Sequence, residues 1–408
     1  MPLQRLRRVL QANYRVHVES SNQLLANVSR QVARRRRELR AKGNRPPIFK
    51  TASVLALLQG RRDWNIRAID LLHKIGFLTT PSWANMARLS ASWATRRYFW
   101  AIGEPQGQPT NLRLSDDARR MDFHQKTLLS DEFGVGMAGL LVENFLNAGS
   151  FVDVSVALGD PAAYQDIELE GKTQPDYLMW GSEPNSPYYV VECKGTQTDR
   201  ATSYDQLRRG LEQVPSVRFG AGQRQIVSVI VATCMLDDRT EVFVLDPPPD
   251  DDYPNKDSSE TVSERTGKRS WRIRDPEAFH QRAVLAEESN LLKWAGQYQT
   301  AAVLDRRLER LQPEAMAMPN APLETRRTRF GDFRGVDQPL FPALGAADLR
   351  LFTGVDEGLL EVLTADRPRA ERAPRQFGLG RQEGQPADHM PAGMSVSQAG
   401  TCMIVEGL

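Results

Sequence analysis

The chain has 408 residues, of which 40% are hydrophobic and 25% are charged, and this composition predicts a globular protein with a sizeable core. No apolar run approaches the roughly 20 residues that a transmembrane helix needs, and the first residues lack the apolar segment of a signal peptide. We therefore expect a cytoplasmic protein with no membrane partner. Three widely spaced cysteines argue against a disulfide framework or a zinc cluster.

Positive charge is concentrated at the N-terminal end of the chain. The formal net charge is only +2, yet residues 1–100 carry 20 Lys and Arg against 4 Asp and Glu. Such an asymmetry favours contact with a polyanion such as nucleic acid. On its own it is equally compatible with a solvated helix face or with an arm that contacts the acidic remainder. The candidate nucleic-acid-binding residues, in the densest cluster, are Arg34, Arg35, Arg36, Arg37, Arg40 and Lys42.

The N-terminal region is predicted to be mainly helical. Residues 1–42 contain few helix breakers and place apolar residues at helical spacing, up to the turn that starts at Gly43. A second block of helical spacing covers residues 51–100. Because the segment around 103–109 is polar and rich in turn residues, we expect a basic N-terminal region over residues 1–110.

The periodicity changes in the middle of the chain. After a helix over residues 128–148, short apolar or alternating runs predict strands. This order indicates an α/β fold with a mixed central sheet flanked by helices, in a core of residues 111–311. Residues 247–270 are polar and charged and predict an exposed insertion. The strands are expected at 151–157, 165–169, 176–180, 188–193, 226–232 and 241–245, and a helix capped by Thr198 or Asp199 at 199–214.

The C-terminal quarter carries fewer functional signals. Residues 276–311 predict a long helix that breaks near Gly296. Residues 312–408 predict a small C-terminal domain, with one helix near 357–363 and a linker-like stretch over 367–391.

Two glycine motifs suggest nucleotide binding but lack the required context. Residues 134–139 match G-x-G-x-x-G, although residues 126–133 before them do not form a convincing buried strand, so a dinucleotide-binding enzyme is the weaker interpretation. Close packing on the sheet of the helix that carries Glu143 explains the glycines at 136 and 139 better. Gly171-Lys-Thr173 lacks the first glycine of a phosphate-binding loop, because Asp166 stands in its place.

The strongest chemical signal lies in Pro175-Asp176 and in Glu192-Cys193-Lys194. Asp176 and Glu192 are expected on neighbouring strands, and side chains two residues apart on a strand share one face. Two carboxylates and an amine would then converge. Carboxylates suit Mg²⁺, which can neutralise the charge of a phosphodiester during attack by water. The Cys193 carbonyl would add a ligand, and Lys194 would act as base or stabilise the transition state.

A second Glu-x-Lys, formed by Glu170 and Lys172, shows that this tripeptide alone is a weak signal. It precedes the acidic motif, has glycine at its centre and joins two predicted strands as a turn. Glu192 and Lys194 instead lie on an apolar strand that follows Pro175-Asp176, and that combination is the more specific one.

Together these motifs resemble the PD-(D/E)XK phosphodiesterase superfamily over roughly residues 125–250. The resemblance implies a restriction-endonuclease-like mixed sheet with Asp176, Glu192 and Lys194 as catalytic residues. It also implies Glu143 as an additional helical carboxylate, so that Glu143, Asp176, Glu192 and Cys193 would bind the metal. Gln206 resembles a polar residue near the catalytic site of some members. Gly210 stands where one exonuclease branch has tyrosine.

The function implied by this resemblance is hydrolysis of DNA by a Mg²⁺-dependent nuclease, with Mn²⁺ able to substitute. Similarity to restriction and anti-phage nucleases suggests an endonuclease in bacterial defence or DNA processing. DNA is favoured over RNA. Double-strand cleavage needs two active sites, so we expect a dimer or higher homo-oligomer, or a partner protein in a defence complex. The alternative is a nucleic-acid-binding or assembly subunit that keeps a nuclease-like fold without cleaving.

Overall fold

The computed structural model describes most of the chain. The segment 248–270 of the expected insertion and the linker-like stretch 367–391 lie outside the described residues. The described residues are 2–44, 49, 51–79, 87–107, 110–158, 167–169, 175–181, 186–214, 217–219, 226–247, 271–273, 276–308, 319–341, 346–365 and 393–407.

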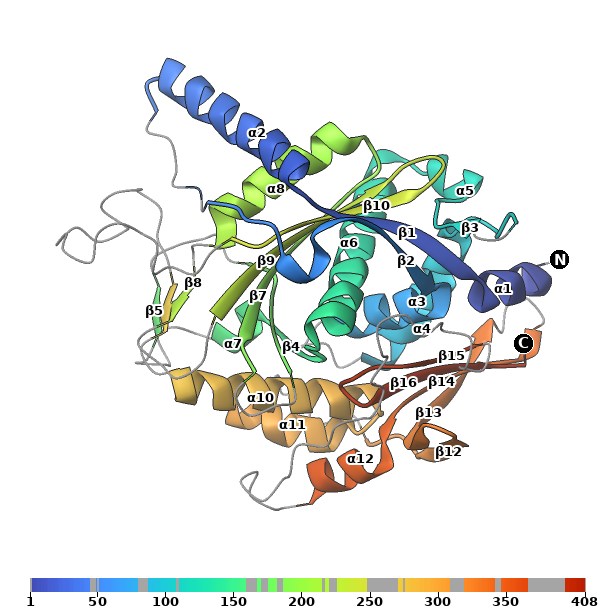
Figure 1. Ribbon diagram of the computed structural model, residues 1–408. Helices are drawn as coiled ribbons and strands as arrows, with labels where there is room; N and C mark the ends of the chain where they lie inside the picture. The colour runs from blue at the N-terminus through green and yellow to red at the C-terminus, as the bar shows by residue number, and fades with distance from the viewer. Residues whose placement is uncertain are drawn as a thin grey trace.

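A mixed eight-stranded sheet forms the centre of the molecule (Figure 1). Its order is β2-β1-β10-β9-β7-β6-β4, with β3 beside β1. The β7–β9 and β1–β10 pairs are parallel, whereas β4–β6, β6–β7, β9–β10 and β1–β2 are antiparallel. The strands are β1 (Asn13–Ser20), β2 (Gly60–Arg67), β3 (Thr110–Asn111), β4 (Ser150–Asp153), β6 (Tyr177–Trp180), β7 (Tyr188–Thr196), β9 (Ile226–Met235) and β10 (Thr240–Leu245).

Helices cover both faces of this sheet. On one face, α6 (Phe123–Leu146) packs against β7 and β9, and α3 (Ala68–Leu78) packs against α6 and β2. On the other face, α8 (Arg200–Gln213) packs against β7 and β9, and α2 (Asn22–Ala41) packs against α8 and β1. Strands buried on both faces read as continuous apolar runs, which is why β9 was recognisable in the sequence. The other helical elements before the C-terminal part are α1 (Pro2–Gln11), η1 (Ala56–Leu58), α4 (Ala87–Tyr98), η2 (Phe99–Ala101), α5 (Asp116–Arg119) and α7 (Val154–Leu158).

The N-terminal region contributes two strands to the central sheet. The prediction of helix was wrong for residues 13–20 and 60–67, which form β1 and β2. Tyr14, Val16 and Val18 are buried while their neighbours are more exposed, and this period of two belongs to a strand. Because β1 pairs with β10, the sheet continues across the expected boundary near residue 110.

The elements of the middle region match the predictions with one correction. The helix expected at 128–148, the strands at 176–180 and 188–193 and the Asp199-capped helix are confirmed. The strand expected at 151–157 ends at Asp153, because the Asp153 carboxylate accepts a 2.7 Å hydrogen bond from the Ser155 N–H where α7 begins. The helices on this sheet and the strands in it follow in the order α6, β4, β6, β7, α8 and β9. Helix α7 and two short strands outside this sheet, Ile167–Leu169 and Val217–Phe219, lie between them in the chain.

Two smaller sheets and three helices complete the described structure. The helix pair α10 (Pro276–Trp294) and α11 (Tyr298–Arg307) confirms the break near Gly296, whose φ is +80°. Helix α12 (Glu357–Thr364) confirms the predicted C-terminal helix. One sheet has the order β12 (Glu324–Thr328), β13 (Gly331–Phe341), β14 (Ala346–Asp356), β16 (Thr401–Glu406) and β15 (Met394–Val396), and the other has β5 (Ile167–Leu169), β11 (Trp271–Ile273) and β8 (Val217–Phe219). Among the described residues, no helix is both long and apolar enough to cross a membrane.

Candidate active site

Strand pairing places Asp176 opposite Glu192. In the antiparallel β6–β7 pair, Tyr177 lies opposite Val191, and the next step of the same register brings Asp176 to Glu192. The backbone N–H of Cys193 donates a 2.7 Å hydrogen bond to Asp176 Oδ2. The structure therefore brings the two motifs together as the sequence predicted.

Glu192 and Lys194 form an ion pair on the face of β7 that is covered by α8. The Glu192 side chain is 0% exposed, and its Oε1 accepts a hydrogen bond from Lys194 Nζ. Its other oxygen, Oε2, is buried without a hydrogen-bond partner in the described part of the chain. Cys193 points to the opposite face and packs in the core with Val191. The site thus holds a buried carboxylate oxygen with unused capacity to bind a cation.

The two carboxyl groups of the site oppose each other's ionisation, whereas Lys194 favours it. Burial raises the pKa of Glu192 to about 8, and the neighbouring Asp176 carboxylate adds to this increase. Burial also raises the pKa of Asp176, although Lys194 opposes that change. Burial alone would lower the pKa of Lys194, but the attraction of Glu192 and Asp176 outweighs it, so the Lys194 pKa is raised. Lys194 is consequently a cation at neutral pH.

Gln206 and Gly210 bring α8 close to the end of β7. Gln206 Nε2 donates a 2.8 Å hydrogen bond to the Gly195 carbonyl, and Gln206 Oε1 is buried without a hydrogen-bond partner among the described residues. At Gly210, an added Cβ would lie 2.5 Å from Ile230 Cγ2 and 3.4 Å from Glu192 Cγ. A tyrosine at this position has no room in the present packing.

The structure does not bring Glu143 to the other predicted residues. Its carboxylate forms a 2.7 Å ion pair with Lys74 and accepts a hydrogen bond from the backbone N–H of Gln398. Glu143 follows Gly134 by nine residues, which is about 180° around an α-helix. Gly134 faces β7, where an added Cβ would lie 2.7 Å from the Lys194 carbonyl oxygen, so Glu143 faces α3 instead. The expected metal ligand is therefore held in a buried structural pair.

Asp131 is the helical carboxylate that the sequence analysis missed. Burial raises its pKa, and the nearby positive charge of Lys194 opposes this change. It lies three residues before Gly134, on the part of α6 that touches the end of β7. An added Cβ at Gly195 would lie 1.8 Å from the Ser130 carbonyl oxygen, so the two backbones are in direct contact there. The small residues at 134 and 195 were the available signal for this contact.

The residues present fit a magnesium ion better than a metal cluster built entirely from protein side chains. Within the described ranges, no group of three His, Cys, Asp or Glu side chains is placed to hold a metal. Mg²⁺ commonly takes only one or two carboxylates and completes its coordination with water and substrate phosphate. Glu192 Oε2 has no other described partner, and Asp176 lies opposite it. These two carboxylates supply the donor atoms that such an ion prefers.

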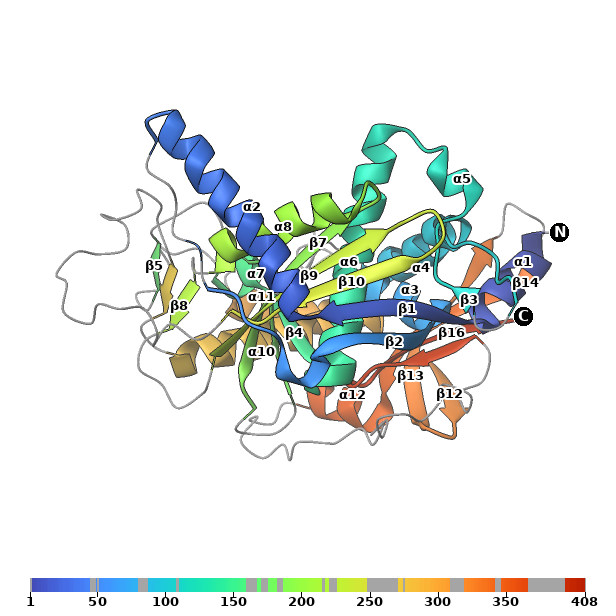
Figure 2. The same ribbon diagram turned by 45° about the horizontal axis from the view of Figure 1, so that its top comes forward.

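The arginine cluster lies apart from this site. Helix α2 carries it along the end that extends away from the sheet (Figure 2). Arg34 and Arg35 lie within 3.5 and 3.7 Å of Glu38, and the Arg36 guanidinium lies over the Phe49 ring. The exposed members of the predicted cluster are Arg34, Arg36, Arg37, Arg40 and Lys42.

Searches against protein-family models, curated proteins and solved structures found no match to this chain.

Proposed function

We propose that this protein is a Mg²⁺-dependent nuclease that hydrolyses DNA, with Asp176, Glu192 and Lys194 at its catalytic centre. The observation that carries this proposal is the fully buried Glu192 carboxylate, which has one oxygen bonded to Lys194, one oxygen without a described partner and Asp176 opposite. Maintaining two carboxylates beside one lysine in a buried position is costly for folding. A role in binding a cation and a phosphate accounts for that cost.

The order of the elements supports the same assignment. Helix α6, strands β4, β6 and β7, helix α8 and strand β9 form a core in which the β7–β9 pair is parallel and the β4–β6 and β6–β7 pairs are antiparallel. This arrangement resembles the restriction-endonuclease-like fold. The site lies towards the end of β7, where Asp176, Glu192 and Lys194 meet. Fold similarity alone does not establish an activity, so the proposal rests on the side chains.

Each residue has a distinct task in this proposal. When bound, Mg²⁺ neutralises the charge that develops on the phosphate and favours ionisation of the attacking water. Asp176 and Glu192 hold the ion, and the backbone N–H of Cys193 fixes the orientation of Asp176. Glu192 and Asp176 raise the pKa of Lys194, and its positive charge orients the water and stabilises the negative transition state.

A panel of duplex DNA, single-stranded DNA and RNA, each with Mg²⁺, with Mn²⁺ or with a chelator, tests the proposal. We expect metal-dependent cleavage of DNA by the wild type and a loss of at least about 100-fold in Lys194→Ala. The matched control is Lys172→Ala, in the second Glu-x-Lys of the sequence, which should retain wild-type activity. The panel includes circular and linear duplexes, because an endonuclease cleaves both whereas an exonuclease needs the free ends of the linear one. Equal cleavage by wild type and Lys194→Ala would refute the assignment of the site.

A non-cleaving nucleic-acid-binding subunit is the second candidate. It is favoured by one observation: Glu143, the expected additional carboxylate, is engaged with Lys74. Such a protein would bind DNA without requiring a metal. If wild type cleaves none of the substrates and binds them equally with and without Mg²⁺, this second function replaces the first. Gel filtration coupled to light scattering determines whether a dimer forms.

A further inference from the structure

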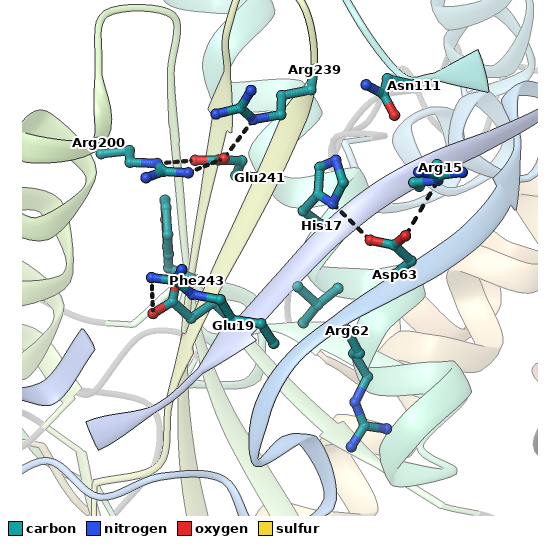
Figure 3. Close-up of a pocket in the computed structure, with 12 residues that line it drawn as sticks. Arg15, His17, Glu19, Arg62, Asp63, Asn111, Arg200, Arg239, Glu241 and Phe243 are labelled. Atoms are coloured by element: carbon teal, nitrogen blue, oxygen red, sulfur yellow. Dashed lines mark hydrogen bonds and ion pairs between the residues drawn. The ribbon is translucent and has the colours of Figure 1, made fainter. Parts of the chain in front are cut away.

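A pocket lies over β1, β2 and β10 (Figure 3). It is on the face of the central sheet that carries Glu192 and Lys194. Residues paired directly on adjacent strands project to the same face. Lys194 pairs with Ala232, Ala232 with Phe243, and Phe243 with Glu19, which lines the pocket. Three strand spacings separate Lys194 from Glu19, or about 14 Å. The pocket has a volume of about 620 Å³.

Arginines from four separate segments surround this pocket. Arg15 comes from β1, Arg61 from β2, Arg200 from the start of α8, and Arg239 from the turn between β9 and β10. In all, five arginines and three carboxylates line the pocket, which gives it an excess of positive charge. An anionic ligand is the natural occupant of such a site.

Buried carboxylates orient these arginines. Arg200 donates through Nε and Nη2 to the two oxygens of Glu241, both at 2.5 Å, and Arg239 donates through Nε to the same carboxylate at 2.7 Å. The Glu241 side chain is 5% exposed. Burial alone would raise the Glu241 pKa, but the two guanidinium groups lower it overall, so Glu241 is ionised at neutral pH. The guanidinium groups are thereby held in position before any ligand arrives.

In the second half of the pocket, Arg61 pairs with a buried carboxylate and Arg15 with an exposed one. Arg61 contacts both oxygens of Glu19, at 2.9 Å through Nε and 3.2 Å through Nη2. Arg15 Nε lies 3.3 Å from Asp63, which also contacts His17 at 2.7 Å. In each case the carboxylate occupies one edge of the guanidinium group.

The remaining edges of the guanidinium groups are available to a ligand. Among the described residues, no hydrogen bond is formed by Arg200 Nη1, Arg239 Nη2, Arg61 Nη1 or either Nη atom of Arg15. Several guanidinium groups around one cavity can donate hydrogen bonds to the oxygens of phosphate groups. Phe243 at the pocket floor is 1% exposed, so it offers no ring face on which a base could stack. Recognition of backbone phosphate is favoured over recognition of a base.

We propose that this pocket binds the phosphate backbone of the nucleic-acid substrate on one side of the scissile bond, and this inference rests on the nuclease function proposed above. A separation of about 14 Å corresponds to about four nucleotides of a B-form strand at 3.4 Å per nucleotide. The pocket therefore positions the strand while Asp176, Glu192 and Lys194 act on it. Contacts to phosphate fix the register of the substrate without reading its sequence.

The test is DNA binding by the full chain, measured by fluorescence anisotropy of labelled DNA with a chelator present so that hydrolysis does not interfere. We expect Arg61→Ala and Arg200→Ala each to weaken binding about tenfold and to reduce the slope of log affinity against log salt by about 1. Arg209→Ala is the matched control, because this exposed arginine lies on the same helix as Arg200 and pairs with Asp205 outside the pocket. Melting temperatures confirm folding. The Arg61 side chain is 64% exposed, so its substitution should not unfold the protein. Arg61→Ala therefore still tests the pocket if Arg200→Ala unfolds.

The possible outcomes separate the two proposals. If wild type cleaves DNA while Arg61→Ala and Arg200→Ala bind and cleave as wild type does, the pocket proposal is wrong and the nuclease function stands. If DNA binding depends on these arginines but no metal supports cleavage, the pocket proposal holds and the nuclease function fails. Binding of inorganic phosphate and of AMP to wild type and to the variants is measured as well. If they bind through these arginines while DNA affinity is unchanged in the variants, the pocket serves a small anion and the backbone proposal is overturned.

Discussion

Asp176 accepts a 2.7 Å hydrogen bond from the backbone N–H of Cys193, the residue between Glu192 and Lys194. One main-chain contact thus connects the two acidic motifs at the point where the β6–β7 pairing ends. A backbone donor lacks the rotamer freedom of a side chain, so the Asp176 carboxylate is held in place before substrate binds.

Asp176→Asn is expected to stabilise the protein in the absence of metal while abolishing cleavage. The asparagine oxygen can still accept the Cys193 hydrogen bond, and one of two mutually repelling carboxylates disappears. Glu192 and Lys194 then form a balanced pair, and we expect a gain of roughly 1 kcal/mol in the free energy of unfolding. Thermal and urea denaturation with a chelator measure this change. A lower stability of the variant would show that the site is not strained by excess negative charge.

Mg²⁺ is expected to raise the melting temperature of wild type. Binding only to the folded state adds a stabilisation that grows with the ratio of ligand concentration to Kd, about 2.7 kcal/mol at 100 times Kd. Asp176→Ala should remove most of this increase because it removes one of two carboxylate ligands. The same titration with Mn²⁺ tests its ability to substitute. An identical increase in wild type and Asp176→Ala would place the bound metal elsewhere.

Glu143→Gln is expected to retain cleavage within a few-fold of wild type. Glu143 is held by Lys74 in a pair whose side chains are 2% and 7% exposed, so its role is structural. Glu143→Ala should cost about 3–5 kcal/mol, since it leaves the Lys74 ammonium buried without its partner. Denaturation curves and initial cleavage rates separate the two effects. A 100-fold loss of rate in a well-folded Glu143→Gln protein would return this residue to the catalytic site.

Gly210→Ala is expected to destabilise the protein by about 1–3 kcal/mol, because the new Cβ would meet Ile230 at 2.5 Å. Combining it with Ile230→Ala should cost less than the sum of the two single changes, since the smaller side chain provides space. A double-mutant cycle of unfolding free energies measures this coupling. Full additivity would mean that α8 adjusts to the methyl group without contacting Ile230.

The Glu241 ion pairs are expected to make stability depend on pH in the acid range. The folded-state pKa of Glu241 is below its ordinary value of 4.5 because Arg200 and Arg239 outweigh the effect of burial. Its contribution to stability is present above about pH 4.5 and is lost as pH falls through the lower folded-state pKa. The stability difference between wild type and Glu241→Gln should therefore shrink below pH 4.5. Melting temperatures from pH 3 to 7 check this, and a constant difference would contradict the pairing.

Local sequence patterns determined much of the middle region of this protein. Alternation along a strand places Glu192 and Lys194 on one face regardless of what surrounds them, and an Asp at the N-cap starts α8 at Arg200. Continuous apolar runs identified β7 and β9. These features depend on neighbours in the chain, so the sequence contains the information needed to predict them.

Only the tertiary structure decided which distant residues meet. A short run such as residues 13–20 is compatible with helix or strand until pairing with β10, more than 200 residues away, buries Tyr14, Val16 and Val18. The rotation of α6 placed Asp131 where the charge of Lys194 opposes the increase in its pKa and turned Glu143 towards α3. The pocket arginines come from four separate segments. Burial and strand pairing stabilise these arrangements through contacts between segments that no local periodicity encodes.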